Sequence, residues 1–157
     1  MKTLNIGKLV ISIIFPLSAG AIAGMFTARA IPEWYTSLKQ PSFNPPDWIF
    51  GPVWTTLYII MGISFFLIWK LAAGKERNQA IGIFLLQLLL NFGWSFFFFY
   101  FNMIGLALIE IFLLWSTIVF MLVRFYKLRP LAAYLNIPYL LWVTFAMVLN
   151  ASYYWLN

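Results

Sequence analysis

The sequence of 157 residues contains no cysteine and no histidine, and only 9% of its residues are charged. Without cysteine the chain has no disulfide bond and no thiolate nucleophile. Without histidine it lacks the commonest metal ligand, the usual axial ligand of haem iron and the usual base at neutral pH. Soluble domains carry about 25% charged residues, so the low charge content also excludes an ordinary globular core.

Apolar and aromatic residues take the place of the missing charges, at 64% and 21% of the chain. About 20 apolar residues cross the hydrocarbon of a bilayer, and continuous apolar runs fit helices rather than the alternating strands of a membrane barrel. The uncharged run 78–109 is too long for one span, and its best turn is residues 102–105. We therefore predict an all-α membrane protein of one domain, residues 1–157, with five transmembrane helices near 6–28, 47–69, 79–101, 104–124 and 130–154.

The net charge of +6 comes from cations that lie at the start of the chain, between the predicted spans or at their ends. Lysine and arginine are enriched in the cytoplasmic loops of membrane proteins. Here eight cations lie on one side of the predicted bundle and two on the other, which predicts a cytoplasmic N-terminus, with the C-terminus and loop 29–47 outside. The same placement makes the lipid bilayer the expected partner and argues against nucleic acid. One side of the predicted bundle has Lys2, Lys8, Lys70, Lys75, Arg77, Arg124, Lys127 and Arg129, and the other has Arg29 and Lys39.

The loop between the first two predicted helices, residues 29–47, combines prolines with aromatic residues. Pro32, Pro41, Pro45 and Pro46 fix the backbone and make the loop stiff. Aromatic side chains such as Trp34 supply flat faces with polar tips. We predict a structured loop that lies as a lid over a pocket for a large, flat, apolar ligand.

Two predicted helices carry stripes of residues spaced four apart, which lie on one face of a helix. The second helix has Phe50, Trp54 and Tyr58, and the fifth has Trp142, Ala146 and Asn150. These stripes fit either a pocket wall or a core or lipid-facing surface, and we favour the pocket because Trp54 and Tyr58 lie deeper than the interfacial aromatic belt.

The third predicted helix has Gln87, Asn91 and Ser95 on one face, beside Trp94 and Phe98. An amide in hydrocarbon needs a hydrogen-bonding partner, so this face points into the bundle. Hydrogen bonding between helices and contact with a ligand both remain open for Asn91. A channel is disfavoured, because only this helix offers a polar lining.

Two further features each allow two interpretations, and a third predicts a single feature. Glu110 is the one acid within a predicted span, and we favour a hydrogen bond between helices over a functional role. Gly20 and Gly24 share a helix face that permits a close approach, and we favour packing within the chain over a subunit contact. Pro138 frees a backbone carbonyl and predicts a kink in the fifth helix.

Three motifs resemble the TspO/MBR family, the tryptophan-rich sensory and translocator proteins. They are WYTSLKQPSFNPPDWIFGPVWTTLY at 34–58, LNFGWS at 90–95 and PYLLWVTFAMVLN at 138–150, and the resemblance covers nearly the whole chain. Animal members carry a cholesterol motif in which a basic residue follows an aromatic one. Here no basic residue follows Tyr153 and Tyr154, so the resemblance points to a bacterial member in the cell membrane.

The resemblance implies a homodimer that binds a porphyrin, such as protoporphyrin IX or a haem-like ring, as a ligand, with no required cofactor. Its role would be tetrapyrrole sensing, handling or transport. Arg29 and Lys39 would meet the propionates. Alternatives are light-dependent degradation of the porphyrin through Trp54 and Trp142, or a regulatory protein with an effector pocket. Together with the stripes, the resemblance gives the predicted ligand-binding residues Trp34, Pro45, Phe50, Trp54, Tyr58, Asn91, Trp94, Phe98, Trp142, Ala146 and Asn150.

Overall fold

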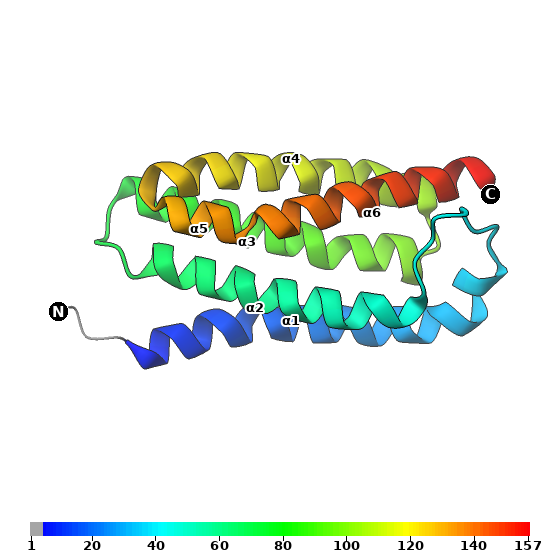
Figure 1. Cartoon of the computed structure of the whole chain (residues 1–157), viewed down its shortest axis with the longest axis horizontal. Coiled ribbons are helices and arrows are strands. Elements are labelled where there is room, and N and C mark those ends of the chain that lie inside the picture. The colour runs from blue at the N-terminus through cyan, green and yellow to red at the C-terminus, as the bar shows by residue number, and fades with distance from the viewer. Residues whose placement is uncertain (1–4) are drawn as a thin grey trace.

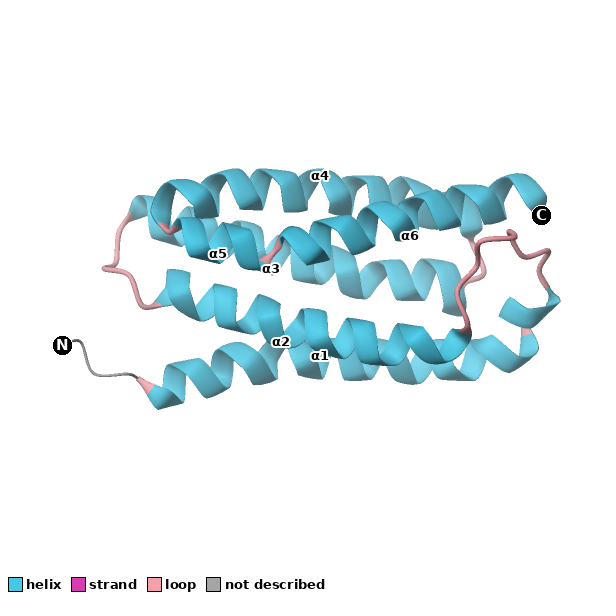
Figure 2. Ribbon diagram, viewed as in Figure 1, coloured by secondary structure: helices cyan, strands magenta, loops and turns pink. Residues whose placement is uncertain are grey.

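The computed structural model describes residues 5–157, which form a bundle of antiparallel helices (Figures 1 and 2). Within these residues five helical segments are long and apolar enough to cross a membrane, and no strand occurs, which confirms the predicted class. The helices are α1 (Ile6–Glu33), α2 (Phe50–Trp69), α3 (Lys75–Ser95), α4 (Ile104–Leu128), α5 (Pro130–Leu135) and α6 (Ile137–Leu156), of which α5 and α6 together form the fifth span.

Helices α1 and α4 end later, and α3 begins earlier, than the predicted bounds. Residues 29–33 belong to α1 and not to the loop, and the Trp34 N–H donates to the Ala30 carbonyl at 3.0 Å beyond Pro32. The predicted bounds were wrong here because charged residues at helix ends reach the polar interface and keep the backbone ladder. Glu76 in the first turn of α3 and Lys127 in the last turn of α4 also have the sign that the helix dipole favours.

The fifth span is broken near Pro138, where the sequence predicts a kink. Helix α5 ends before Asn136 and α6 begins after it. The buried Asn136 amide donates to the Ser64 hydroxyl at 2.6 Å and to the Ala132 carbonyl at 2.9 Å. Ser64 in turn donates to the same carbonyl at 2.7 Å. The break is therefore held by polar side chains of two helices, as a backbone irregularity inside a membrane requires.

Helix α3 continues into a π-helical segment, η3 (Phe96–Tyr100), and then reverses. The predicted turn after it is confirmed, because Asn102 has a positive φ of 58° and α4 begins at Ile104. Asparagine tolerates this left-handed conformation better than most residues. The third and fourth spans are thereby separate helices that run side by side (Figure 1).

Residues 34–49, named the lid here, connect α1 to α2 and are structured, as predicted. They include two short 3₁₀ helices, η1 (Tyr35–Ser37) and η2 (Asp47–Ile49). The buried Tyr35 hydroxyl donates to the Asn44 side chain at 2.8 Å, and burial raises the pKa of this phenol. The Asn157 amide accepts from the Lys39 N–H at 2.8 Å and donates to its carbonyl at 3.2 Å. The lid is thus fastened to the end of α6.

The two ends of the bundle differ in charge. The start of α1, the α2–α3 connection and the α4–α5 junction lie at one end, on the left of Figure 1, and carry seven of the predicted cytoplasmic cations. Lys2, the eighth, lies outside the described residues. We name this the basic end, and the opposite end, with Arg29 and Lys39, the lid end.

Aromatic and aliphatic packing fills the half of the bundle at the basic end. Phe65 of α2 stacks on Phe84 of α3 with ring centroids 4.3 Å apart, and Phe84 and Phe125 are fully buried. Helices α1 and α2 touch there, since a Cβ on Gly62 would lie 2.6 Å from the Ile13 Cα. The half of the bundle at the lid end is not filled in this way, and the site lies there.

Candidate functional site

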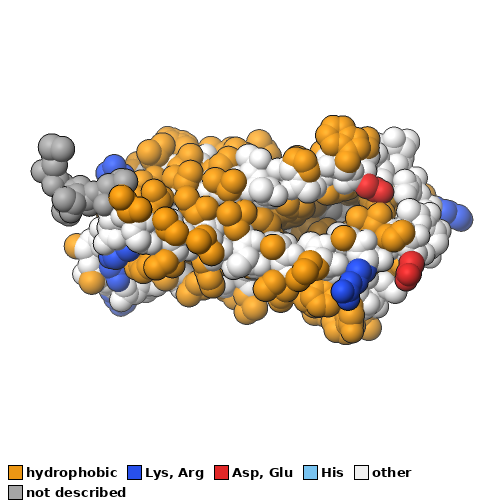
Figure 3. Space-filling model, turned by 90° about the horizontal axis from the view of Figure 1, so that it is seen from below, with side chains coloured by type: hydrophobic (Ala, Val, Ile, Leu, Met, Phe, Trp, Pro, Cys, Tyr) orange, Lys and Arg blue, Asp and Glu red, His pale blue; other side chains and the backbone are white. Residues whose placement is uncertain are grey.

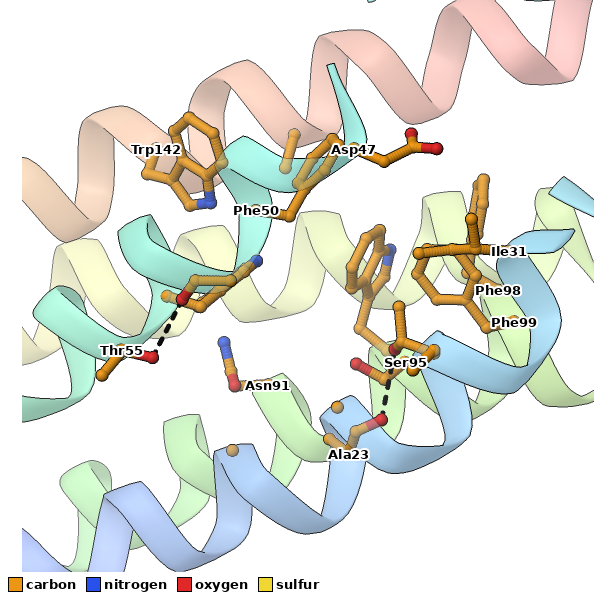
Figure 4. Close-up of a pocket in the computed structure, with 18 of the residues that line it drawn as sticks. Ala23, Ile31, Asp47, Phe50, Thr55, Asn91, Ser95, Phe98, Phe99 and Trp142 are labelled. Carbon is orange, nitrogen blue, oxygen red and sulfur yellow. Dashed lines mark hydrogen bonds between the residues drawn. The ribbon is translucent and has the colours of Figure 1, made fainter. Parts of the chain in front are cut away.

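A cavity of about 400 Å³ lies below the lid, between α1, α2, α3 and α6 (Figure 4). Its volume falls in the range of small-molecule pockets, roughly 300–1,000 Å³. The sequence predicts much of its wall. Nine of the predicted ligand-binding residues line it: Phe50, Trp54, Tyr58, Asn91, Trp94, Phe98, Trp142, Ala146 and Asn150.

Trp34 and Pro45 are the predicted residues that do not line the cavity. Because α1 extends to Glu33, Trp34 caps this helix, and its ring lies edge-on against Phe98 with centroids 5.4 Å apart. The neighbouring Tyr35 reaches the cavity in its place. Pro45 is half-buried within the lid, so it shapes the lid without contributing to the wall.

The α1 wall was missed by sequence reasoning. Small residues at steps of four, Gly20, Gly24 and Ala28, line the cavity together with Thr27 and Ile31. The first two glycines were noticed, but as a place for helix contact rather than for a ligand. Their continuation into Ala28 is the signal that could have identified this wall. Other lining residues that the prediction lacked are Leu17, Ala21, Ala23, Tyr35, Asp47, Gly51, Thr55, Ser95, Phe99, Leu149 and Tyr153.

Gly20 packs within the chain, as the favoured interpretation expects. A Cβ at this position would lie 2.1 Å from the ring of Tyr58, so only glycine fits beside it. Gly24, one turn further, has no described atom within 4 Å of its Cβ position and lies on the cavity. The glycine stripe therefore serves one close helix contact and one stretch of cavity wall.

Flat ring faces make up most of the remaining wall. Trp54 stacks on Tyr58 with centroids 5.6 Å apart, and Trp94 stacks on Phe98 at 5.5 Å. Phe50 meets Trp142 edge-on. These rings come from α2, α3, η3 and α6, so the two predicted stripes converge on one cavity (Figure 4). Such a wall offers apolar area and stacking to a planar guest.

A hydrogen-bonded chain of side chains closes the floor of the cavity. The Tyr58 hydroxyl donates to the Asn91 amide oxygen, and the Asn91 amide donates to the Tyr139 hydroxyl at 3.2 Å. Tyr139 then donates to Gln87 at 2.8 Å. Asn91 thus makes the hydrogen bonds between helices that the sequence left open beside ligand contact, and the chain ties α2, α3 and α6 together below the cavity.

Asn150 and Trp94 also satisfy each other. The Trp94 indole N–H donates to the Asn150 side-chain oxygen at 3.0 Å, and the Asn150 amide donates to the Ile104 carbonyl at 3.1 Å. Both residues lie on the wall, but their polar atoms serve the contact between α3, α4 and α6. Their chemical contribution to a guest is therefore mainly their apolar surface.

Two buried donors on the wall have no partner within residues 5–157. They are the Trp142 indole N–H and the Tyr153 hydroxyl. In Figure 4 the Trp142 nitrogen lies on the cavity side of its ring. A buried donor without an acceptor costs roughly 1–3 kcal/mol. A guest with a suitably placed acceptor would recover part of that free energy.

The charges around the cavity differ from those expected. Asp47 of the lid is a lining residue, whereas no lysine or arginine of the described chain lines the cavity. Arg29 and Lys39 lie at the lid end but outside the wall, and both are exposed. A carboxylate of a guest would therefore have to reach the rim to meet either cation.

Glu110 lies outside the cavity, and its predicted hydrogen bond between helices is wrong. It is 7% exposed, and neither carboxyl oxygen has a partner in the described part of the chain. Its neighbour on α3 is Gly93, whose Cβ position is 3.6 Å from the Glu110 Oε1. A glycine has no side chain to donate, so the expected bond is not made.

Known proteins of one family are similar to this chain over nearly its whole length. Residues 12–156 match the model of the TspO/MBR family. The chain is 40% identical over 144 residues to the tryptophan-rich protein TspO of Chlorobaculum tepidum, covering 90% of each chain. It is 37% identical over 154 residues to the protein of that name from Archaeoglobus fulgidus, covering 98% of this chain and 99% of the relative.

Similarity extends to animal proteins. The human translocator protein is 40% identical over 120 residues, which cover 75% of this chain and 71% of the human one. The lid and much of the aromatic cavity wall come from the motifs 34–58, 90–95 and 138–150, all within the matched region. Five apolar helices, these motifs and the extent of the match together show that the chain belongs to the TspO/MBR family.

Proposed function

We propose that this membrane protein binds porphyrins and other flat apolar molecules in the cavity below the lid, and that it acts in tetrapyrrole sensing, handling or transport. The observation that carries the proposal is the convergence of stacked aromatic rings from three spans on one cavity. A planar macrocycle presents two apolar faces, which such walls bind by burial and stacking. The name of the human relative, translocator protein, agrees with handling of a ligand.

The polar groups of the site fit the same class of guest. The imine-type nitrogens of a free-base porphyrin and the carbonyl oxygens of other guests can accept from the free donors of Trp142 and Tyr153. Since no cation lines the described cavity wall, the propionates of a porphyrin would point to the rim and to water, toward Arg29 and Lys39. The apolar ring would then lie inside and its charges outside.

A titration of the purified protein with protoporphyrin IX tests the proposal. Saturable quenching of tryptophan fluorescence, together with a shifted Soret band that remains through detergent exchange, is the expected result. Quenching that rises linearly with porphyrin and matches that of a detergent blank would refute binding in the cavity.

Light-dependent degradation of the bound porphyrin is a second candidate. It is favoured by the position of two oxidisable indoles, Trp54 and Trp142, on the wall of one cavity. Illumination of the complex separates the two candidates. A loss of porphyrin absorbance that requires the protein, and that falls in the Trp54→Phe and Trp142→Phe variants, would indicate chemistry. A spectrum as stable as that of free porphyrin would leave binding alone.

We further propose a homodimer in a bacterial cell membrane, with a cytoplasmic basic end. Gly20 packs against the Tyr58 ring of its own chain, so the dimer contact would use another apolar face. The exposed α3 face with Leu85, Leu86 and Leu89 is the candidate. Crosslinking in bilayers would test it: a Leu86→Trp variant should lower the dimer yield several-fold, and an unchanged yield would exclude this face.

A further inference from the structure

We propose that the cavity takes up its ligand sideways, from the hydrocarbon of the bilayer, through a portal between α1 and α2. The inference rests on the proposed function, since it concerns the route of the flat apolar ligand. Figure 3 shows the molecule hollowed on this face toward the lid end. The portal rim is defined by small residues that both line the cavity and are exposed on the outside of the bundle: Ala21, Gly24, Ala28, Gly51 and Thr55.

Helices α1 and α2 are in contact at the basic end and part toward the lid end. At Gly62 a Cβ would lie 2.6 Å from the Ile13 Cα, so the two backbones touch. At Gly20 a Cβ would still meet a tyrosine ring of α2. At Gly24 and Gly51 the Cβ positions have no described atom within 4 Å. The gap therefore starts just beyond Gly20 and continues to the lid.

The portal faces lipid rather than water. It lies beside Ile22 and Met25, which are 44% and 59% exposed on the outer face of α1. The five rim residues carry no charge, and the one hydroxyl among them is already used, because Thr55 donates to the Gly51 carbonyl at 2.9 Å. The exposed Asp47 also lines the cavity, but it belongs to the lid and precedes α2. Gly51 and Thr55 are in the first two turns of α2, within about 10 Å of its start. Hydrocarbon can cover such a rim without leaving a polar group unsatisfied.

The route from water is closed by the lid. Lys39 and Asn157 are joined by two backbone-to-side-chain hydrogen bonds across the end of the bundle. Phe43 of the lid packs against Phe145 of α6, with ring centroids 6.3 Å apart, and the buried Tyr35 fills the space beneath. A ligand from water would have to break these contacts. A ligand dissolved in the bilayer meets an opening that already exists.

Rates of binding in lipid nanodiscs test the portal. We expect Gly24→Leu combined with Gly51→Leu to slow both association and dissociation of protoporphyrin IX at least tenfold, whereas leucines that only fill the cavity would speed dissociation. The matched control is Gly82→Leu on α3, since its Cβ position is also free of described atoms within 4 Å but lies outside the cavity. Its rates should stay within twofold of the parent. Parent-like rates in the double variant would overturn the portal.

A locked lid gives the reciprocal test. The natural chain has no cysteine, so Lys39→Cys with Asn157→Cys introduces the only pair that can form a disulfide. The oxidised protein should bind porphyrin at the rate of the reduced one, and an association rate tenfold lower would overturn the proposal. The leucine variant could bind no porphyrin because its side chains fill the cavity. In that case the locked-lid measurement still tests the portal. A parent protein that binds no porphyrin would instead refute the proposed function.

A third measurement needs no ligand. Lipids with brominated acyl chains quench those tryptophans that hydrocarbon reaches. The parent should be quenched more than its Trp54→Phe variant, and this difference should shrink when Gly24 and Gly51 are leucines. Equal quenching of the parent and the Trp54→Phe variant would overturn the open portal whether or not porphyrin binds.

Discussion

Among single residues, we expect Trp142 and Tyr153 to contribute most to the recognition of a guest. Their donors are buried on the cavity wall without an acceptor in residues 5–157, whereas Trp94, Asn91 and Asn150 use their polar atoms on each other or on neighbouring helices. The wall therefore combines a largely apolar surface with two free hydrogen-bond donors. We therefore expect the site to favour planar molecules that have a hydrogen-bond acceptor at the edge facing these donors.

Replacing Trp142 or Trp54 by phenylalanine should weaken porphyrin binding about fivefold each without unfolding the protein. The variants keep an aromatic body, but the Trp142 variant loses a free donor and the Trp54 variant loses stacking area on Tyr58. Titration by fluorescence quenching measures the change. Trp155→Phe is the control, because Trp155 is 79% exposed on the same helix as Trp142. Equal affinities in all three would place the binding site elsewhere.

Gly20→Ala should lower the thermal stability of the protein in detergent. The added Cβ would lie 2.1 Å from the Tyr58 ring, and this kind of overpacking costs roughly 1–3 kcal/mol. Gly82→Ala is the matched control, since its Cβ position is free and alanine favours a helix. A Gly20→Ala protein that melts with the control would show that Tyr58 moves aside at little cost.

Among the elements, the lid shows how proline content becomes structure. Pro45 and Pro46 precede η2 and set the direction in which the chain enters α2. Replacing both by glycine should give the disordered lid more conformational freedom, so that ordering the lid costs about 1 kcal/mol more free energy for each residue. Protease added from the lid side should then cut the lid more than tenfold faster, while the helical circular dichroism stays unchanged. Pro130→Gly, at the basic end, is the control and should leave this cleavage rate as it is. Cleavage at the parent rate would mean that the Lys39–Asn157 contact alone orders the lid.

Sequence patterns predict the elements better than their ends. Continuous apolar runs give the five spans, and steps of four give the walls of α2 and α6, because these depend on local periodicity alone. The extra turn of α1 could not be predicted from the apolar run, since Pro32 and Glu33 read as loop residues. Because of this extra turn, Tyr35 lines the cavity and Trp34 does not.

The part of the site on α1 escaped prediction for a different reason. A helix shows the same pattern of glycine and alanine in its sequence whether another helix or a cavity lies opposite. Only the three-dimensional arrangement distinguishes Gly20, which meets Tyr58, from Gly24, which meets the cavity. Likewise, the missing partner of Glu110 depends on a glycine that lies opposite on α3.

For the whole molecule, the distribution of charge gives a testable orientation. Seven of the nine described cations lie at the basic end, and the sequence prediction adds Lys2 on that side. The positive-inside rule then predicts a cytoplasmic N-terminus and an external lid. Reporter fusions at the two termini should be active on opposite sides of the membrane. Two termini on the same side would contradict the arrangement of five spans.

The packed half of the bundle, at the basic end, determines if a molecule in the cavity can cross the membrane through the protein. Below the cavity, the Tyr58–Asn91–Tyr139–Gln87 chain forms a floor, and the Phe65–Phe84 stack fills the space beyond it. In this conformation the cavity is a dead end and not a conduit. On the proposed route, a molecule that enters from one leaflet would have to return to it, and the protein would exchange its ligand with that leaflet only. Passage to the other side would require these buried rings to separate.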